Sequence, residues 1–207
     1  MSTLRALENK VRGLINEKRY LHTLGVRDTA LLLCRQYGCS RKKAEVAALL
    51  HDIARDLPVE KMVELIQTNG LWKGEYSVIE HNPLLLHAHA GRVIALTEFN
   101  VHDVEILQSI ELHTTGGESM SLLDKIIFVA DFTEPGRTFR GVEKARELAR
   151  MDLDRAVLYI YSYILRHLLK REVFICKNTF LGYNEIVLQV GKGLNQRITG
   201  DRWVSKL

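Results

Sequence analysis

Apolar residues recur along most of this chain at intervals of three and four positions, which is the period of a helix with one buried face. Turn and capping residues divide this pattern into segments. The segments predict helices over residues 4–18, 18–37, between 40 and 58, and over 58–69, 82–99, 101–113, 122–132, 142–150, 152–171 and 179–190. We find no convincing pair of β-strands. The pattern therefore predicts an all-α protein.

Capping residues support several of these boundaries. Gly38 is suited to end a helix, because glycine readily adopts the left-handed conformation of a helix C-cap. Asn82 followed by Pro83 is typical of a helix start. Ser121 with Asp124 three residues later resembles a capping box, with aspartate in place of the usual glutamate.

The remaining segments are expected to be irregular. Residues 71–81 are predicted to form a loop, and residues 191–207, which contain Gly, Asn and scattered charge, a loosely ordered tail. The chain has 207 residues, three prolines and no long linker. We therefore expect residues 1–190 to form one helical bundle.

Composition limits the protein's setting and partners. The net charge of +4 is too small to argue for nucleic acid as a partner. We predict no membrane partner, because no stretch approaches the roughly 18 apolar residues needed to span a bilayer. The N-terminus lacks an apolar signal region, which favours the cytoplasm. Cys34 and Cys39 lack zinc spacing, and an odd total of three cysteines argues against a disulfide framework, so we interpret both as free thiols.

Candidate chemistry centres on His51-Asp52, which interrupts the apolar run of residues 44–53. Similar interruptions recur on other apolar helix faces at His22, His113 and Asp131. Taken alone, His22 is more simply explained as a core histidine bonded to a backbone carbonyl. A buried charge is costly unless it is paired or bound to metal, so the full ordered set favours one shared metal centre.

One further ligand is ambiguous. His87 and His89 are two positions apart and lie on opposite sides of their predicted helix, so only one can face inward. The periodicity leaves both open, although His87 shares its face with the small residues Ala90 and Gly91. Four imidazoles and two carboxylates suit Fe, Mn, Zn, Co or Ni. Asp52 could bridge two ions, and a two-metal centre is well suited to hydrolysing phosphate esters and anhydrides.

Several stretches of the chain resemble the HD-domain metal-dependent phosphohydrolases, whose ligand pattern is H…HD…H…H…D. The more detailed likeness is to the YqeK-type symmetrical bis(5′-nucleosyl)-tetraphosphatases of bacteria. It covers about residues 18–188 and rests on KRYLHTLG, AALLHDIARDLP, HTTG, ADFTEPGR and GVEKARELA. The likeness implies that diadenosine tetraphosphate is split into two ADP at a centre of two iron ions.

Carried over to this sequence, the likeness implies a particular ligand set and selects His87 over His89, because the ligand follows a Leu-Leu pair. The implied ligands are His22, His51, Asp52, His87, His113 and Asp131. The sequence departs from the family at Arg55, where lysine is common, and at His89, where an apolar residue is usual.

Substrate contacts are less constrained than metal ligands. We assign catalytic roles to Asp52, Arg137 and Arg55. We expect Arg137 to clamp phosphate, with Arg55 as the second candidate, because guanidinium groups bind phosphate oxygens in pairs. An ion pair with Glu134 is the alternative role of Arg137. Thr114 and Thr115 are candidate hydroxyl or amide donors.

Two function classes compete with this hypothesis. One is another HD-type hydrolase: a nucleotidase, a phosphodiesterase or a guanosine tetraphosphate hydrolase. The other is a nucleotide-binding sensor without hydrolytic activity, which the complete ligand set disfavours. The sequence leaves the oligomeric state open, including a homodimer.

Overall fold

A computed structural model describes residues 4–70 and 76–191, and every regular element in these two ranges is helical, which confirms the all-α prediction. The elements are α1 (Leu4–Arg12), α2 (Glu17–Tyr37), α3 (Arg41–Leu50), α4 (Val59–Thr68), α5 (Tyr76–His81), the 3-10 turn η1 (Pro83–Leu85), α6 (Leu86–Thr97), α7 (Val104–Leu112), α8 (Leu122–Thr133), α9 (Val142–Met151), α10 (Leu153–Lys170) and α11 (Lys177–Val190).

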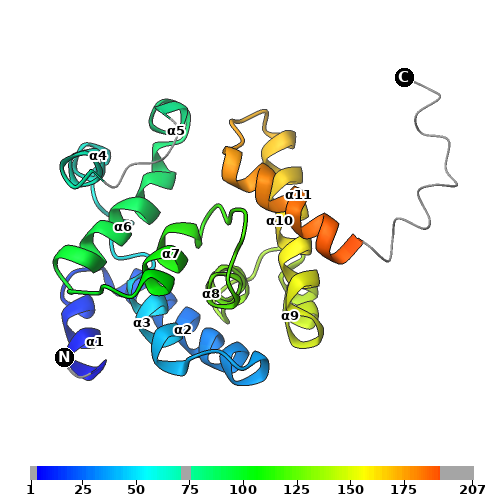
Figure 1. Cartoon of the computed structure of the whole chain (residues 1–207), viewed down its shortest axis with the longest axis horizontal. Coiled ribbons are helices and arrows are strands. Elements are labelled where there is room, and N and C mark those ends of the chain that lie inside the picture. The colour runs from blue at the N-terminus through cyan, green and yellow to red at the C-terminus, as the bar shows by residue number, and fades with distance from the viewer. Residues whose placement is uncertain (1–3, 71–75, 192–207) are drawn as a thin grey trace, which may run out of the picture.

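Helix α8 is the central element of the bundle. It packs against α2, α3 and α7 on one side and against α9 and α10 on the other (Figure 1). Its residues Ile126, Ile127 and Val129 are completely buried, as expected for an apolar helix surrounded by others. The predicted capping box of Ser121 and Asp124 is present at its start. Asp131 is therefore carried on a helix that neighbours fix from both sides.

Small residues let the helices around the candidate ligands approach closely. A Cβ atom at Gly91 on α6 would lie 3.4 Å from the backbone oxygen of His51 and 3.4 Å from Ile110 of α7. A methyl group would already be in van der Waals contact on both sides, so a side chain longer than alanine would push α6 away from the end of α3. Gly91 therefore keeps the segments that carry His51, His87 and His113 together.

The α10–α11 hairpin supports the loop after α7. Tyr161 is buried, and its hydroxyl accepts a hydrogen bond from the backbone N–H of Gly117 at 2.9 Å. Gly116 has a φ of 60°, and a Cβ atom there would lie 1.9 Å from the Tyr161 hydroxyl. Both the backbone conformation and the contact therefore require glycine.

Three predicted boundaries are wrong in detail. The first helix ends at Arg12, and the next begins at Glu17 because the Asn16 side chain caps it through the backbone N–H of Arg19. Asn82 makes no side-chain cap, and a 3-10 turn precedes α6. The predicted loop 71–81 contains α5 at its end, and its first five residues lie outside the described ranges.

The interpretation of two cysteines as free thiols is also wrong. Cys34 and Cys39 form a disulfide, with Cα atoms 4.7 Å apart. Gly38 ends α2 in the left-handed conformation, and the N–H groups of Gly38 and Cys39 both bond to the Cys34 carbonyl. This tight turn returns the chain so that the two sulfur atoms meet.

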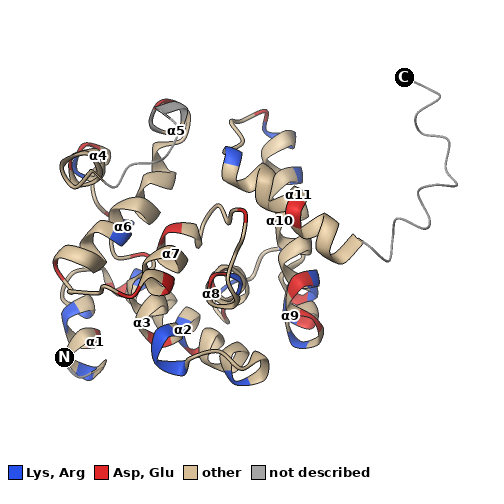
Figure 2. Ribbon diagram, viewed as in Figure 1, with Lys and Arg blue, Asp and Glu red and all other residues tan. Residues whose placement is uncertain are grey.

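Charges of both signs are interspersed on the helices, as on α9 (Figure 2). Among the helices of residues 4–70 and 76–191, none combines the length and the apolar character needed to cross a membrane. The predicted tail falls outside the described residues from position 192 onward.

Candidate metal centre

Four histidines and two aspartates from five helical segments meet inside the bundle. His22 comes from α2, His51 and Asp52 from the end of α3, and His87 from α6. His113 follows α7, and Asp131 lies on α8. These six residues are called the cluster below: His22, His51, Asp52, His87, His113 and Asp131. His51, His87 and His113 are buried, and the side chain of His22 is 12% exposed.

Asp52 lies at the centre of the cluster. Its Oδ1 atom is 3.2 Å from Nε2 of His87 and 3.5 Å from Nε2 of His113. Its Oδ2 atom is 3.7 Å from Nε2 of both His22 and His51. One carboxylate therefore faces histidines on two sides.

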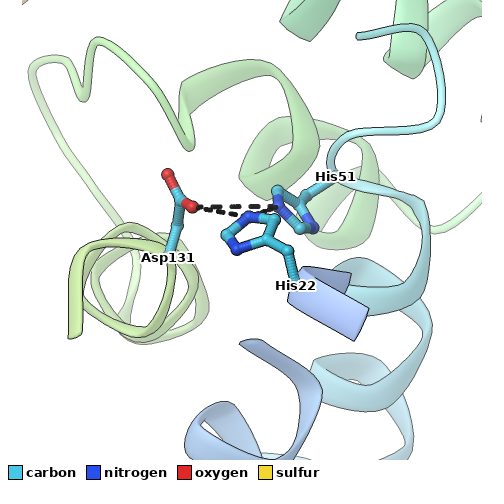
Figure 3. A group of neighbouring side chains, drawn as sticks. All are labelled: His22, His51 and Asp131. Carbon is cyan, nitrogen blue, oxygen red and sulfur yellow. Dashed lines mark hydrogen bonds and ion pairs between the residues drawn. The ribbon is translucent and has the colours of Figure 1, made fainter. Parts of the chain in front are cut away.

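The second carboxylate completes one of the two groups. Asp131 Oδ1 lies 3.0 Å from Nε2 of His22 and 4.0 Å from Nε2 of His51 (Figure 3). In this group, and in a second one formed by His51, Asp52 and His113, potential ligand atoms all lie within 4.8 Å of one another. Mixed imidazole and carboxylate donors at this separation fit divalent transition metals.

The orientation of the imidazole rings supports this fit. In His51, His87 and His113 the Nδ1 atom lies 2.5–2.7 Å from the backbone oxygen of the residue three positions earlier. A proton on Nδ1 donated to that oxygen leaves the Nε2 lone pair directed into the cluster. The main chain thus selects the tautomer that can bind a metal.

Burial keeps the central imidazoles uncharged. It lowers the pKa of His51 to about 4 and also lowers the pKa of His87. Burial alone would raise the pKa of Asp52, but the imidazoles of His51, His113 and His87 around it hold the pKa well below the ordinary value. Neutral imidazoles around an ionised carboxylate are the protonation states that metal binding requires.

Three arginines surround the cluster and are called the rim: Arg19, Arg55 and Arg137. Arg19 Nη1 donates to Asp52 Oδ2 at 2.6 Å, and Arg137 Nη2 donates to Asp131 Oδ1 at 2.6 Å. Arg55 Nη1 lies 2.9 Å from His87 Nδ1. Arg137 is closer to Asp131 than to Glu134, from which its Nε atom is 3.7 Å away.

The two threonines of the loop after α7 face in different directions. The Thr114 hydroxyl lies 2.8 Å from His113 Nε2 and 3.1 Å from His87 Nε2, so it faces the cluster. The Thr115 hydroxyl donates to the Gly116 carbonyl at 2.9 Å and is buried in its own loop. The structure therefore brings only the first of the two side chains to the centre.

The structure also separates His87 from His89. His87 enters the cluster, whereas His89 Nδ1 lies 3.0 Å from Glu111 Oε1, in a group with Arg92. Sequence reasoning did not identify Arg19, although its position three residues before His22 places both on one face of α2.

Comparisons with known proteins agree on one family. The HD domain family model matches residues 19–136. The symmetrical bis(5′-nucleosyl)-tetraphosphatase of Bacillus subtilis (strain 168) is 40% identical over 177 residues, covering 86% of this chain and 94% of that protein. The protein of the same name from Halalkalibacterium halodurans is 38% identical, with the same two coverages.

A solved structure shares the fold. It is the crystal structure of a predicted HD superfamily hydrolase involved in NAD metabolism from Clostridium acetobutylicum. It aligns with a TM-score of 0.86 at 38% identity, over 91% of this chain and 99% of that chain.

Proposed function

We propose that this chain, which belongs to the HD domain family, hydrolyses diadenosine tetraphosphate and related dinucleoside polyphosphates symmetrically, giving two ADP. The observation that carries this proposal is the position of Asp52 between two groups of histidines, which suits a centre of two metal ions. The names of the relatives that align over nearly their whole length support the substrate and the bond that is cleaved.

The cluster would hold the metal ions through its four histidines and two aspartates. Its donor set suits iron, which we favour over manganese, cobalt, nickel and zinc because of the family resemblance. Two bound ions supply an activated water and neutralise negative charge on the phosphate that is attacked. Asp52, whose two oxygens face histidines on two sides, would be one of the residues that hold these ions.

The rim supplies the positive charge that a tetraphosphate requires. Arg137 has a side chain that is 37% exposed and a guanidinium group bonded to Asp131 of the cluster, so it can turn from Asp131 to bind phosphate oxygens in a pair. Arg55 lies on the opposite side, beside His87. Cations on two sides would stabilise the charge that develops on the inner phosphate oxygens during attack.

Thr114 is the hydroxyl that we assign to substrate positioning. It lies within hydrogen-bonding distance of two cluster histidines and two residues before Gly116, whose φ of 60° fixes the loop. Thr115 has its hydroxyl bonded within the loop, so its part in substrate binding is limited to the backbone.

Product analysis in ¹⁸O-labelled water tests the proposal. Metal-loaded protein should convert diadenosine tetraphosphate to ADP as the sole early product, with one labelled oxygen for each pair of ADP molecules. Early ATP and AMP would contradict symmetrical cleavage. No product from any dinucleoside polyphosphate, with metal bound and the protein folded, would contradict the assignment as this hydrolase.

A further inference from the structure

Glu134 stands out among the cluster's neighbours as a buried carboxylate with no role in the set derived above. It is 4% exposed and lies where α8 ends. Its Oε1 atom lies 3.1 Å from Nδ1 of His22, and its Oε2 atom accepts the backbone N–H of Gly136 at 2.5 Å. Both carboxylate oxygens are therefore satisfied, one of them by the imidazole of a cluster residue.

Two glycines make the space for this carboxylate. A Cβ atom at Gly25, which lies on α2 three residues after His22, would be 2.6 Å from Oε2 of Glu134. A Cβ atom at Gly136 would be 2.9 Å from the same oxygen. Contacts this short do not occur between a real Cβ and a buried carboxylate, so either side chain would displace Glu134.

The position of His22 explains why a carboxylate is needed there. The other three cluster histidines lie at helix ends, and each directs Nδ1 to the backbone oxygen three residues earlier. His22 lies inside α2, where the carbonyls of the preceding turn accept the helix's own N–H groups. A side chain must therefore supply the acceptor that the main chain supplies elsewhere.

We infer that Glu134 is a positioning residue, which holds the His22 ring with Nδ1 protonated and Nε2 available for metal. A carboxylate that accepts the Nδ1 proton also makes Nε2 of the imidazole a more basic metal ligand than a neutral carbonyl acceptor does. His22 thus differs from its three counterparts in both orientation and basicity. The inference rests on the proposed function only in taking the cluster as a metal centre, and no step of hydrolysis enters it.

Titration of metal-free protein with Co²⁺ tests the inference. Glu134→Ala should weaken binding about 10–100-fold, as is usual when the partner of a ligating histidine is removed. Glu111→Ala is the matched control, because Glu111 bonds His89 with the same atoms at 3.0 Å, away from the cluster. The control should bind Co²⁺ as the unmodified protein does.

A second pair of variants consists of one that displaces the carboxylate without removing its charge and one that serves as its control. Gly25→Ala should weaken Co²⁺ binding in the same direction, whereas Gly13→Ala, whose Cβ would meet nothing closer than 3.5 Å, should not. Glu134→Gln keeps one acceptor but loses the charge, so its affinity should fall between those of the unmodified protein and Glu134→Ala. This pair and Glu134→Gln decide the matter if Glu134→Ala does not fold.

The Nδ1 proton of His22 gives a readout that a purely structural role would not change. Without metal, Asp131 Oδ1 lies 3.0 Å from Nε2 of His22 and competes for the ring proton, so the measurement uses protein loaded with Zn²⁺. NMR should then show a hydrogen-bonded Nδ1 proton on His22, and this hydrogen bond should be lost in Glu134→Ala. Folded Glu134→Ala with unchanged Co²⁺ affinity and an unchanged His22 Nδ1 proton signal would overturn the inference. Inactivity towards dinucleotides, with these differences in metal binding intact, would count against the proposed function alone.

Discussion

The cluster and the rim contain ionisable groups only a few ångströms apart, yet they are built in different ways. Four of the six cluster side chains are buried, while those of His22 and Asp131 are 12% and 22% exposed, and backbone oxygens fix the rings of His51, His87 and His113. Rim guanidinium groups are partly exposed, at 25% for Arg19 and 37% for Arg137. Function in the cluster should therefore depend on protonation and exact placement, whereas function in the rim should depend mainly on positive charge.

The largest expected effect comes from the centre of the cluster. Replacing Asp52 by Ala should remove most of the bound metal and abolish turnover, because this carboxylate faces histidines on two sides. Metal content and hydrolysis should be measured together. Asp154→Ala, which breaks an ion pair with Lys125 far from the cluster, is the control and should retain both. A metal-loaded, active Asp52→Ala protein would contradict the account of the cluster.

Acid should also act on the cluster rather than on the rim. The pKa of His51 is about 4 in the folded state, below its ordinary value, so between pH 6.5 and 4 the unfolded chain binds the proton more strongly. The free energy of unfolding of metal-free protein should therefore fall as the pH falls through this range, by up to about 3 kcal/mol. His22, whose pKa is raised, acts only above this range.

Urea unfolding of the metal-free protein at a series of pH values measures this effect. His51→Gln removes the titrating group, so the variant should lose much of the slope between pH 6.5 and 4. An unmodified protein that is equally stable across the range would mean that His51 is not held neutral.

A smaller effect is expected in the rim. Arg137→Gln should lower kcat/KM about 10–100-fold, the range for loss of a hydrogen bond to a charged group, while metal content stays the same. Arg166→Gln, on the exposed side of α10, is the control and should change neither quantity. Loss of metal in Arg137→Gln would show that its bond to Asp131 supports the cluster instead.

The smallest effect should come from the second histidine of α6. His89→Ala is expected to leave metal content unchanged and activity within about twofold, as for a substitution outside the centre. His87→Ala should lose metal. The reverse pattern would show that the two histidines have been assigned the wrong way round.

The contrast between cluster and rim also explains what the sequence could predict. Helix periodicity directed His51, Asp52 and Asp131 inward, because an apolar stripe fixes the inward direction; the first two are buried, and the Asp131 side chain is 22% exposed. Periodicity left His87 and His89 open, and the structure separates them through the packing of α6 against α7. The bonds of Arg19 and Glu134 join segments far apart in the chain, so no local pattern reveals them.

Two local predictions, one confirmed and one wrong, show how far along the chain a sequence pattern can be used. The Ser121 and Asp124 capping box was predicted because both partners lie within one helical turn. The Cys34–Cys39 disulfide was missed because cysteine count and spacing do not reveal that Gly38 turns the chain back sharply. Features that depend on one turn of helix can be predicted, whereas features that depend on the path of the backbone cannot.

Metal analysis of freshly purified protein is the most direct test of the central claim that the buried cluster is a dinuclear metal centre. Elemental analysis should find close to two transition-metal ions per chain, with iron the main one, and Asp52→Ala should lose most of them. Protein that holds no metal tightly, and that added iron, manganese or cobalt does not activate, would contradict the claim.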